Sequence, residues 1–322
     1  MANILIVGSG VVGTATGRGF AQIGHDVTFV DVMPERVRRL RSEGFNAQAS
    51  TTLGEVPTFI FLTIPTPHVG RRYDLTAFDD AVPAVGRAIA MSSAAHTVIV
   101  RSTVPPGTTE NMVQPLLEAN SGKTLGNDFA LAANPEFLRA ASADADFRHP
   151  WMTVIASRDA QTRGQLGDLL SPFGGETRFF DNPATAEFIK CSHNIFNAAK
   201  ISFWNEMWLV ANSIGVDLNE ISSTVALSAE ASFNPQYGIR GGAAYGGACL
   251  PKDTNGFLGF AADCGLAMPL LEAVVHTNER LDTLQNPKAK NLDTDTGPQP
   301  QTAELESSAA GDAGALSMTG RP

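Results

Sequence analysis

The sequence is poor in cysteine, in positive charge and in long hydrophobic runs. Its three cysteines, Cys191, Cys249 and Cys264, are too few and too odd in number for a disulfide framework. Its 33 acidic residues outnumber the 23 lysines and arginines, and the net charge of −10 argues against a nucleic-acid groove or an anionic membrane surface as partner. No stretch approaches the roughly 20 apolar residues of a membrane-spanning helix.

Two further absences bear on location and on metal binding. The N-terminus passes from Met-Ala-Asn directly into the apolar run Ile4–Val7, without a basic segment or a cleavage site, so we expect a cytoplasmic protein. The six histidines lack ligand spacing with one another, and we predict no metal site. What the chain does have is length and apolar residues, because 322 residues, 43% of them hydrophobic, suffice for about two domains.

A dinucleotide-binding fingerprint opens the chain. The run Ile4–Val7 is typical of a strand, and Thr14–Ile23 has the pattern of a helix. Between them lies Gly8-Ser9-Gly10-Val11-Val12-Gly13, and a second strand, Val27–Val30, leads to Asp31. Strand, G-x-G-x-x-G, helix, strand and acid in this order predict a site where the glycines admit a pyrophosphate to the helix N-terminus.

The fingerprint predicts NAD as the cofactor. Asp31 is expected to accept hydrogen bonds from the adenine ribose hydroxyls, and its charge disfavours the 2′-phosphate of NADP. The nearby Arg36 partly weakens that preference. Contacts to the cofactor are assigned to Gly8, Gly10, Val11, Val12 and Gly13.

Further strands alternate with helical stretches, which favours a Rossmann-type, doubly wound parallel sheet of the α/β class. The strand ranges are Thr58–Ile64, Thr97–Arg101, Phe129–Ala132 and Met152–Ile155. Thr66, Thr103 and Glu136 follow three of these strands, and ligands bind at the carboxyl ends of such strands. We therefore expect the nicotinamide and the substrate to meet there, although ordinary loop residues are the alternative interpretation.

An all-helical second domain follows the sheet. A helical pattern runs from Ala184 to Ile214, and its Lys190 and Asn194 are four residues apart, so they share a face. Glu187 and Asn197 lie near the same stripe. A solvated polar face is the default interpretation of these four side chains.

Two more helical stretches and a tail complete the chain. We predict helices over Leu218–Ala231 and Thr254–Leu284, the second broken at Gly265 and Pro269. From residue 291 the sequence is rich in Thr, Ser, Gly, Ala, Pro and acids, and it cannot bury enough apolar surface to offset its ordering entropy. The predicted organisation is a NAD-binding domain over residues 1–183, a helical domain over 184–286 and a disordered tail over 287–322.

The stretch Tyr245–Asp253 carries the most distinctive side chains of the helical domain. Two glycines, which allow a backbone to approach a ligand closely, precede Cys249, and Lys252 and Asp253 come just after it. A thiol among a cation, a carboxylate and backbone N–H groups can be held as the nucleophilic thiolate. A packed, inert cysteine is the alternative, because free cysteines are mostly buried.

Taken together, these stretches resemble the UDP-glucose/GDP-mannose 6-dehydrogenase family, and the likeness extends from Met1 to about Leu284. The matching stretches are Gly8–Gly13 with Asp31, Arg101–Thr108, Asn134–Leu138, Lys190–Asn194 with Lys200, Ile201, Asn205 and Glu206, and Gly246–Asp253. The segment Tyr237–Tyr245, which contains Arg240, is closer to the GDP-mannose branch. Family members pair through the long helical segment, so the resemblance also implies a homodimer.

The resemblance implies a four-electron oxidation of the CH₂OH group of a sugar nucleotide to a carboxylate with two NAD. It makes Cys249 the nucleophile that forms a thiohemiacetal and then a thioester. It makes Lys190 and Asn194 the pair that stabilises the oxyanion, and Glu136 the carboxylate that activates water. Asp253 and Thr103 order the water and proton network. The other implied contacts are Thr66, Thr103 and Lys252 to the cofactor, and Glu136, Phe137, Leu138, Lys190, Asn194, Arg240, Tyr245 and Gly246 to the substrate.

Three features depart from the family's pattern. Position 140 is alanine where the family has a second glutamate, and the chain between Gly44 and Thr58 is short. The family's C-terminal nucleotide-sugar-binding domain has no counterpart, so we predict a short member of the family. Because remote binding energy helps to position the reacting carbon, we expect a smaller alcohol as substrate: a nucleoside, a nucleotide or a sugar phosphate. A partner chain that supplies the lid is the alternative.

Two other functions stay open. The β-hydroxyacid dehydrogenases also join a Rossmann domain to a helical domain, with a lysine and an asparagine four residues apart, and they carry out one two-electron oxidation that needs no thiol. A non-catalytic NAD-binding scaffold is the second alternative, because a fold alone does not establish an activity. The combination of Glu136, Lys190, Asn194, Cys249 and Asp253 argues against a scaffold.

Overall fold

The computed structural model describes residues 1–69, 72–228, 243–246 and 250–285, without the side chains of Lys252, Asp253 and Gln285. The chain divides into two compact units, Met1–Lys200 and a second that begins at Ile201, and each is described by itself. Three of the predictions above, Arg240, Cys249 and the tail over 287–322, lie outside the described residues.

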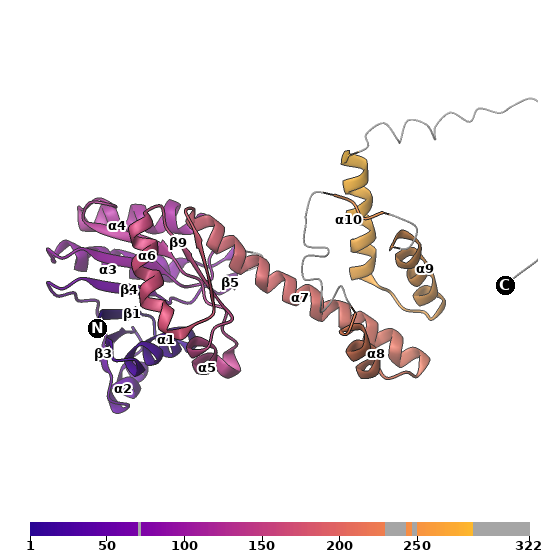
Figure 1. The fold of residues 1–322 in the computed structure, drawn as a ribbon, viewed down its shortest axis with the longest axis horizontal. Coiled ribbons are helices and arrows are strands. Elements are labelled where there is room, and N and C mark those ends of the chain that lie inside the picture. Colours follow the sequence, from indigo (N-terminus) through magenta and orange to yellow (C-terminus); the bar gives the residue numbers. More distant parts are fainter. Residues whose placement is uncertain (70–71, 229–242, 247–249, 286–322) are drawn as a thin grey trace, which may run out of the picture. The chain divides into compact units, whose positions relative to one another are not determined.

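The first unit is built on an eight-stranded sheet with the order β10-β9-β8-β7-β4-β1-β2-β3 (Figure 1). Neighbouring strands from β3 to β8 run parallel, whereas β9 is antiparallel to β8 and parallel to β10. The strands are β1 Asn3–Val7, β2 Asp26–Val30, β3 Asn46–Gln48, β4 Thr58–Leu62, β7 His96–Val100, β8 Phe129–Ala133, β9 Met152–Ala156 and β10 Glu176–Phe180. The pair β5 (His68–Val69) and β6 (Arg72–Tyr73) forms a separate small sheet.

Both faces of this sheet are covered by helices, which explains the continuous apolar runs of its inner strands. Successive side chains of β1 enter opposite cores, with Ile4 and Ile6 in one cluster and Leu5 and Val7 in the other. The helices α1 (Val11–Gln22), α2 (Pro34–Ser42), α5 (Ala143–Arg148) and α6 (Ala160–Leu170) contribute to the first cluster, and α3 (Thr76–Ala90) and α4 (Gln114–Ser121) contribute to the second.

The predicted α/β fold is confirmed. Each predicted strand corresponds to an observed strand with ends that agree to within two residues. The sequence did not predict β3 and β10, because β3 has only three residues and β10 (Glu-Thr-Arg-Phe-Phe) lacks a buried apolar run. It also did not predict the reversed direction of β9 and β10, since a strand's residues do not reveal its direction in a sheet.

The second unit contains the rest of α7 (Pro183–Ile214), which begins in the first unit, together with α8 (Leu218–Val225), α9 (Leu250–Asp263) and α10 (Pro269–Gln285). Val210, Ala261 and Met268 form its small buried core. Glu206 is buried and accepts hydrogen bonds from the backbone N–H groups of Leu270 (2.6 Å) and Leu271 (3.2 Å), so it caps the start of α10.

One sequence prediction for this unit was inaccurate and another is confirmed. Helix α8 ends at Val225 rather than at Ala231. The predicted break at Gly265 and Pro269 is present, because α9 ends at Asp263 and α10 begins at Pro269. Proline suits the first turn of a helix, where the N–H groups have no partner within the helix. Within the described residues, no helix combines the length and apolar character needed to cross a membrane.

Candidate functional site

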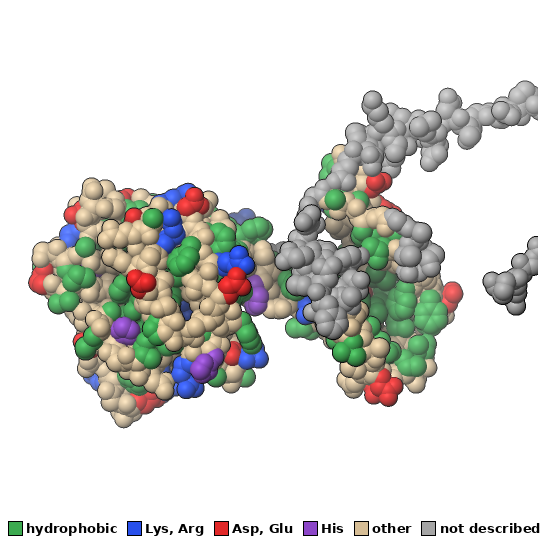
Figure 2. Space-filling view, viewed as in Figure 1, with side chains coloured by type: hydrophobic (Ala, Val, Ile, Leu, Met, Phe, Trp, Pro, Cys, Tyr) green, Lys and Arg blue, Asp and Glu red, His purple; other side chains and the backbone are tan. Residues whose placement is uncertain are grey.

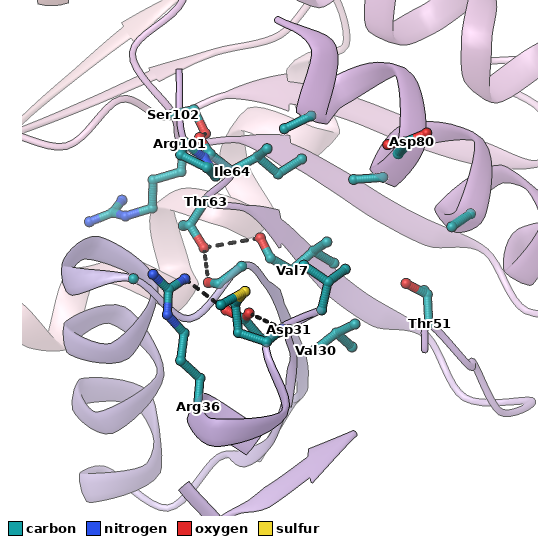
Figure 3. Close-up of a pocket in the computed structure, with 18 of the residues that line it drawn as sticks. Val7, Val30, Asp31, Arg36, Thr51, Thr63, Ile64, Asp80, Arg101 and Ser102 are labelled. Atoms are coloured by element: carbon teal, nitrogen blue, oxygen red, sulfur yellow. Dashed lines mark hydrogen bonds and ion pairs between the residues drawn. The ribbon is translucent and has the colours of Figure 1, made fainter. Parts of the chain in front are cut away.

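A cleft of about 1090 Å³ lies at the carboxyl edge of the parallel strands of the first unit. Strand β1 lies between β2 and β4 in the sheet. The chain adds β2 and β3 on one side of β1 and then adds β4, β7 and β8 on its other side, so the order of the strands reverses beside β1. Such a reversal opens a crevice for a ligand. The cleft is lined by the glycine turn after β1 and by the loops after β2, β4, β7 and β8, and Figure 3 shows Asp31, Thr63, Arg101 and Ser102 around it.

The glycine turn between β1 and α1 is shaped to hold a pyrophosphate. Gly8 has a φ of +96°, and a Cβ at this position would lie 2.6 Å from the carbonyl oxygen of Thr63. A Cβ on Gly13 would clash with the carbonyl oxygen of Gly8, whereas one on Gly10 meets no protein atom within 4 Å. Gly10 lines the cleft and is the N-cap of α1, so the positive end of the helix dipole and an open space lie together. These residues fit the pyrophosphate of NAD.

Asp31 fixes the end of β2 to the glycine turn. Its Oδ2 atom accepts hydrogen bonds from the backbone N–H (2.7 Å) and the hydroxyl (2.7 Å) of Ser9, and its Oδ1 atom accepts from the backbone N–H of Met33 (2.9 Å). The Arg36 guanidinium lies 3.3 Å from Oδ2 (Figure 3). Burial opposes ionisation of Asp31, but the hydrogen bonds from these groups together outweigh it and lower its pKa. Asp31 is therefore a fixed negative charge at the cleft.

The predicted threonines lie together in the cleft. Thr66 follows β4 and Thr103 follows β7, and the Thr66 hydroxyl donates a hydrogen bond to the Thr103 carbonyl oxygen (2.6 Å). Both residues line the cleft with Glu136. The carboxyl ends of β4, β7 and β8 thus meet, as the order of the strands requires.

A buried ion pair joins the sheet to α7. The Lys190 ammonium lies 3.2 Å from the Glu136 carboxylate, and their side chains are only 5% and 12% exposed. The ammonium also lies 5.3 Å from the centre of the Phe137 ring. Glu136 accepts a hydrogen bond from the backbone N–H of Leu138 (2.5 Å) with its other oxygen. The structure thus brings together Lys190 and Glu136, to which the resemblance assigned separate roles, and those roles stay predictions.

Arg101 and Asn134 form a buried hydrogen-bonded pair close to Glu136. The Arg101 guanidinium donates to the Thr16 hydroxyl (3.0 Å) and to the side-chain oxygen of Asn134 (2.5 Å). Burial lowers the pKa of Arg101 to about 10, and the negative charge of Glu136 acts in the opposite direction. The guanidinium is therefore still a cation at neutral pH, so Glu136 has two cationic neighbours.

Glu187 links α7 to the loop that follows β7. It is 3% exposed, and its carboxylate accepts hydrogen bonds from the backbone N–H groups of Gly107 (2.5 Å) and Thr109 (2.8 Å) and from the Thr109 hydroxyl (2.6 Å). Burial raises its pKa, and these hydrogen bonds oppose that effect. Because Glu187 lies one turn before Lys190, its bonds also fix the position of Lys190 on the sheet.

Glu187 and Lys190 contradict the default interpretation of a solvated polar face, since both are almost fully buried. Helical spacing shows which side chains share a face, but it does not show what packs on that face. The sequence signal that could have identified Glu187 is the turn after Pro105-Pro106, because the backbone N–H groups of Gly107 and Thr109 need an acceptor there.

Asp146 holds the loop that carries Glu136. Its carboxylate accepts hydrogen bonds from the backbone N–H (2.8 Å), Nε (3.0 Å) and Nη2 (2.7 Å) of Arg139, and from the Ser142 hydroxyl (2.9 Å). The hydrogen bonds from Arg139 hold the pKa of Asp146 well below its ordinary value near 3.8. These hydrogen bonds begin at Arg139, the residue directly after Leu138, and set the path of the chain there.

Replacing Asp146 by asparagine should therefore make the protein less stable in a pH-dependent way. A lowered pKa in the folded state contributes stability above pH 3.8, the unfolded value, and that contribution disappears as the pH falls through the lowered pKa. We expect the variant to melt a few degrees below the wild type at pH 7 and the difference to shrink below about pH 4. Thermal unfolding across pH 3–7 measures this, with the exposed Asp144→Asn as control; a difference independent of pH would contradict it.

Other predicted residues are not brought to the cleft by the described contacts. Asn194 is exposed, one turn along α7 from Lys190, and its described side-chain partner is His193. In the second unit, the backbone N–H and carbonyl of Tyr245 bond the Asn278 side chain (2.6 and 3.0 Å), and Gly246 is exposed. Lys252 and Asp253 lie in the first turn of α9. Their roles, and that of Cys249, stay predictions.

Among the described residues, no group of three or more His, Cys, Asp or Glu side chains is placed to hold a metal ion.

Comparison with known proteins gives one consistent result. Residues 2–50 and 44–173 match the NAD-binding domain of the UDP-glucose/GDP-mannose dehydrogenase family, and residues 184–280 match its central domain. The chain is 33% identical to the GDP-mannose 6-dehydrogenase of Pseudomonas aeruginosa over 304 residues, which are 85% of this chain and 68% of that protein. It is 31% identical to the UDP-glucose 6-dehydrogenase of Haloferax volcanii, over 85% of this chain and 69% of that protein.

A solved structure agrees with these matches. A ternary complex of GDP-mannose dehydrogenase from Pseudomonas aeruginosa is similar with a TM-score of 0.80 at 30% identity, over 91% of this chain and 72% of that one. The likeness therefore includes the helical region as well as the sheet.

Proposed function

The chain belongs to the UDP-glucose/GDP-mannose dehydrogenase family, and on that premise we propose that it oxidises a primary alcohol of a sugar nucleotide, nucleotide or nucleoside to a carboxylate. The family and the NAD cofactor predicted from the sequence are confirmed. The observation that carries the proposed reaction is the buried Lys190–Glu136 pair, because Glu136 also lines the NAD cleft.

The first oxidation makes an aldehyde from the alcohol. Bound NAD supplies a hydride acceptor, once for each of the two oxidations. Lys190 stabilises the negative charge that develops on the substrate oxygen, and Asn194, one turn away on α7, donates a second hydrogen bond to it. The Lys190 side chain is only 5% exposed, so water screens its charge little. Its electrostatic stabilisation of the substrate oxygen is therefore stronger than that of an exposed lysine.

The second oxidation needs a nucleophile, because an aldehyde cannot lose hydride until its carbon is tetrahedral. In the proposal the sulfur of Cys249 forms a bond to the aldehyde carbon and the oxygen gains a proton, which gives a thiohemiacetal. Loss of hydride and of the hydroxyl proton gives the thioester. Water activated by Glu136 then bonds to the carbonyl carbon and the C–S bond breaks, which releases the acid and the thiol. Cys249 lies outside the described residues, so this step rests on the sequence and on the family.

The number of NADH formed per alcohol tests the proposal. We expect two for the wild type and one for Cys249→Ala, which should stop at the aldehyde. Cys264→Ala is the matched control and should keep a ratio of two. A wild-type ratio of one would support the β-hydroxyacid type of reaction instead, and unchanged acid formation by Cys249→Ala would exclude the thioester. NAD binding without turnover of any alcohol would support the scaffold.

The substrate is proposed only as a class. The family relatives named above act on GDP-mannose and UDP-glucose, according to their names. A panel of UDP-glucose, GDP-mannose, free nucleotides and free nucleosides, followed by NADH absorbance, identifies the member of the class. Turnover of the two sugar nucleotides alone would rule out the prediction of a smaller alcohol.

We also propose that the protein is a cytoplasmic homodimer that pairs through α7. This helix exposes large apolar side chains, namely Phe188, Ile195, Phe196, Ile201, Phe203 and Trp208. Figure 2 shows hydrophobic side chains gathered over helices of the second unit as well. A surface of this kind suits an isologous contact between two copies. Light scattering should give twice the chain mass for the wild type and less for Ile195→Glu; a monomeric wild type would refute the dimer.

A further inference from the structure

A chain of side-chain hydrogen bonds runs along α7 beside the proposed catalytic asparagine. The side-chain nitrogen of Asn197 lies 3.4 Å from Nε2 of His193, and Nδ1 of His193 lies 3.2 Å from the side-chain oxygen of Asn194. The three residues belong to the first unit and to one stretch of helix. His193 has no role in the reaction predicted from the sequence.

With both amides oriented as in the structure, the donors and acceptors of this chain have one consistent assignment for a neutral imidazole. The amide nitrogen of Asn197 can only donate, so Nε2 of His193 accepts. A neutral imidazole that accepts at Nε2 carries its proton on Nδ1, which then donates to the oxygen of Asn194. The oxygen of Asn194 is thus occupied, and both N–H groups of its amide stay available to a ligand.

The imidazole is held by the same ring that contacts Lys190. The His193 ring packs edge-on against Phe137, with 5.1 Å between ring centres, and the Lys190 ammonium lies 5.3 Å from the centre of the Phe137 ring. Phe137 directly follows Glu136, the partner of Lys190. His193 is therefore connected through one aromatic side chain to the buried ion pair.

We propose that His193 is a positioning residue that orients the Asn194 amide so that its nitrogen faces the substrate oxygen. The proposal rests on the proposed function, in which Asn194 stabilises that oxygen. Asn194 is exposed, and an exposed amide without a partner samples both orientations, one of which presents an oxygen to the oxyanion. A fixed donor avoids this reorganisation during the reaction, which is the advantage of a preorganised site.

The test separates the hydrogen bond from the packing of the ring. His193→Phe keeps an aromatic ring against Phe137 and removes the donor, and we expect kcat to fall about tenfold with the KM for NAD unchanged. His193→Asn places an amide nitrogen close to the position of Nδ1, and we expect it to retain kcat within about threefold. Equal kcat for His193→Phe and the wild type would overturn the proposal.

A double variant shows whether His193 acts through Asn194. Asn194→Ala alone should lower kcat about 100-fold, and His193→Phe should cause no further loss in that background. Independent losses that multiply would refute a role through Asn194. If the wild type turns over no alcohol in the substrate panel, the proposed function fails; if the wild type is active and His193→Phe equals it, only the positioning role fails.

Discussion

Replacing Lys190 by methionine should lower kcat about a thousandfold. Removal of one preorganised electrostatic group at a reacting oxygen costs about 10²–10³ in rate. Lys190 also balances the negative charge of Glu136, so its loss removes a second favourable interaction. NAD affinity should change less than about twofold, because Lys190 does not line the cleft. Steady-state kinetics and a fluorescence titration with NADH measure the two quantities. The exposed Ser192→Ala, on the same turn of α7, is the control.

The same variant separates catalysis from stability. Loss of Lys190 leaves the Glu136 carboxylate in a site that is 12% exposed, with Arg101 as its remaining cationic neighbour. Breaking a buried pair in this way costs about 3 kcal/mol of unfolding free energy. The double variant Lys190→Met/Glu136→Gln should recover most of that stability and none of the activity. A single variant with kcat within threefold of the wild type would remove Lys190 from the mechanism.

Replacing Gly13 by alanine should weaken NAD binding about 100-fold, because the added methyl group collides with the backbone of the turn that carries the pyrophosphate site. The clash involves the carbonyl oxygen of Gly8, which cannot move without moving the end of β1, and the Thr63 hydroxyl, 2.5 Å from the added Cβ. The unfolding free energy should also fall by about 1–3 kcal/mol.

Two matched glycines distinguish a damaged fold from a damaged site. A Cβ on Gly10 meets no protein atom within 4 Å, so Gly10→Ala should unfold like the wild type and still lose about tenfold in NAD affinity, because the methyl group lies where the pyrophosphate approaches α1. Gly164 is exposed within α6, and Gly164→Ala should raise the unfolding free energy by about 0.5–1 kcal/mol. The NAD affinity of this variant should equal that of the wild type. Equal NAD affinity for all three variants would exclude the pyrophosphate site.

The sequence by itself determined the family, the cofactor and most of the first unit. Local rules were sufficient there, because a G-x-G-x-x-G turn between a strand and a helix has few geometries and the apolar runs of buried parallel strands are distinctive. The same rules placed Thr66, Thr103 and Glu136 after strands whose carboxyl ends meet at one cleft.

Only the tertiary structure decided which polar side chains of α7 are buried and what they contact. Lys190 contacts Glu136, and Glu187 contacts the loop after β7, whereas helical spacing assigned both to one polar stripe with Asn194. The contact of His193 with Asn194 was not predicted. The direction of β9 and β10 and the buried hydrogen-bonded pair of Arg101 and Asn134 were decided in the same way. The physical reason is that burial, and with it the strength of a charge, depends on residues that are far apart in the sequence and adjacent only after folding.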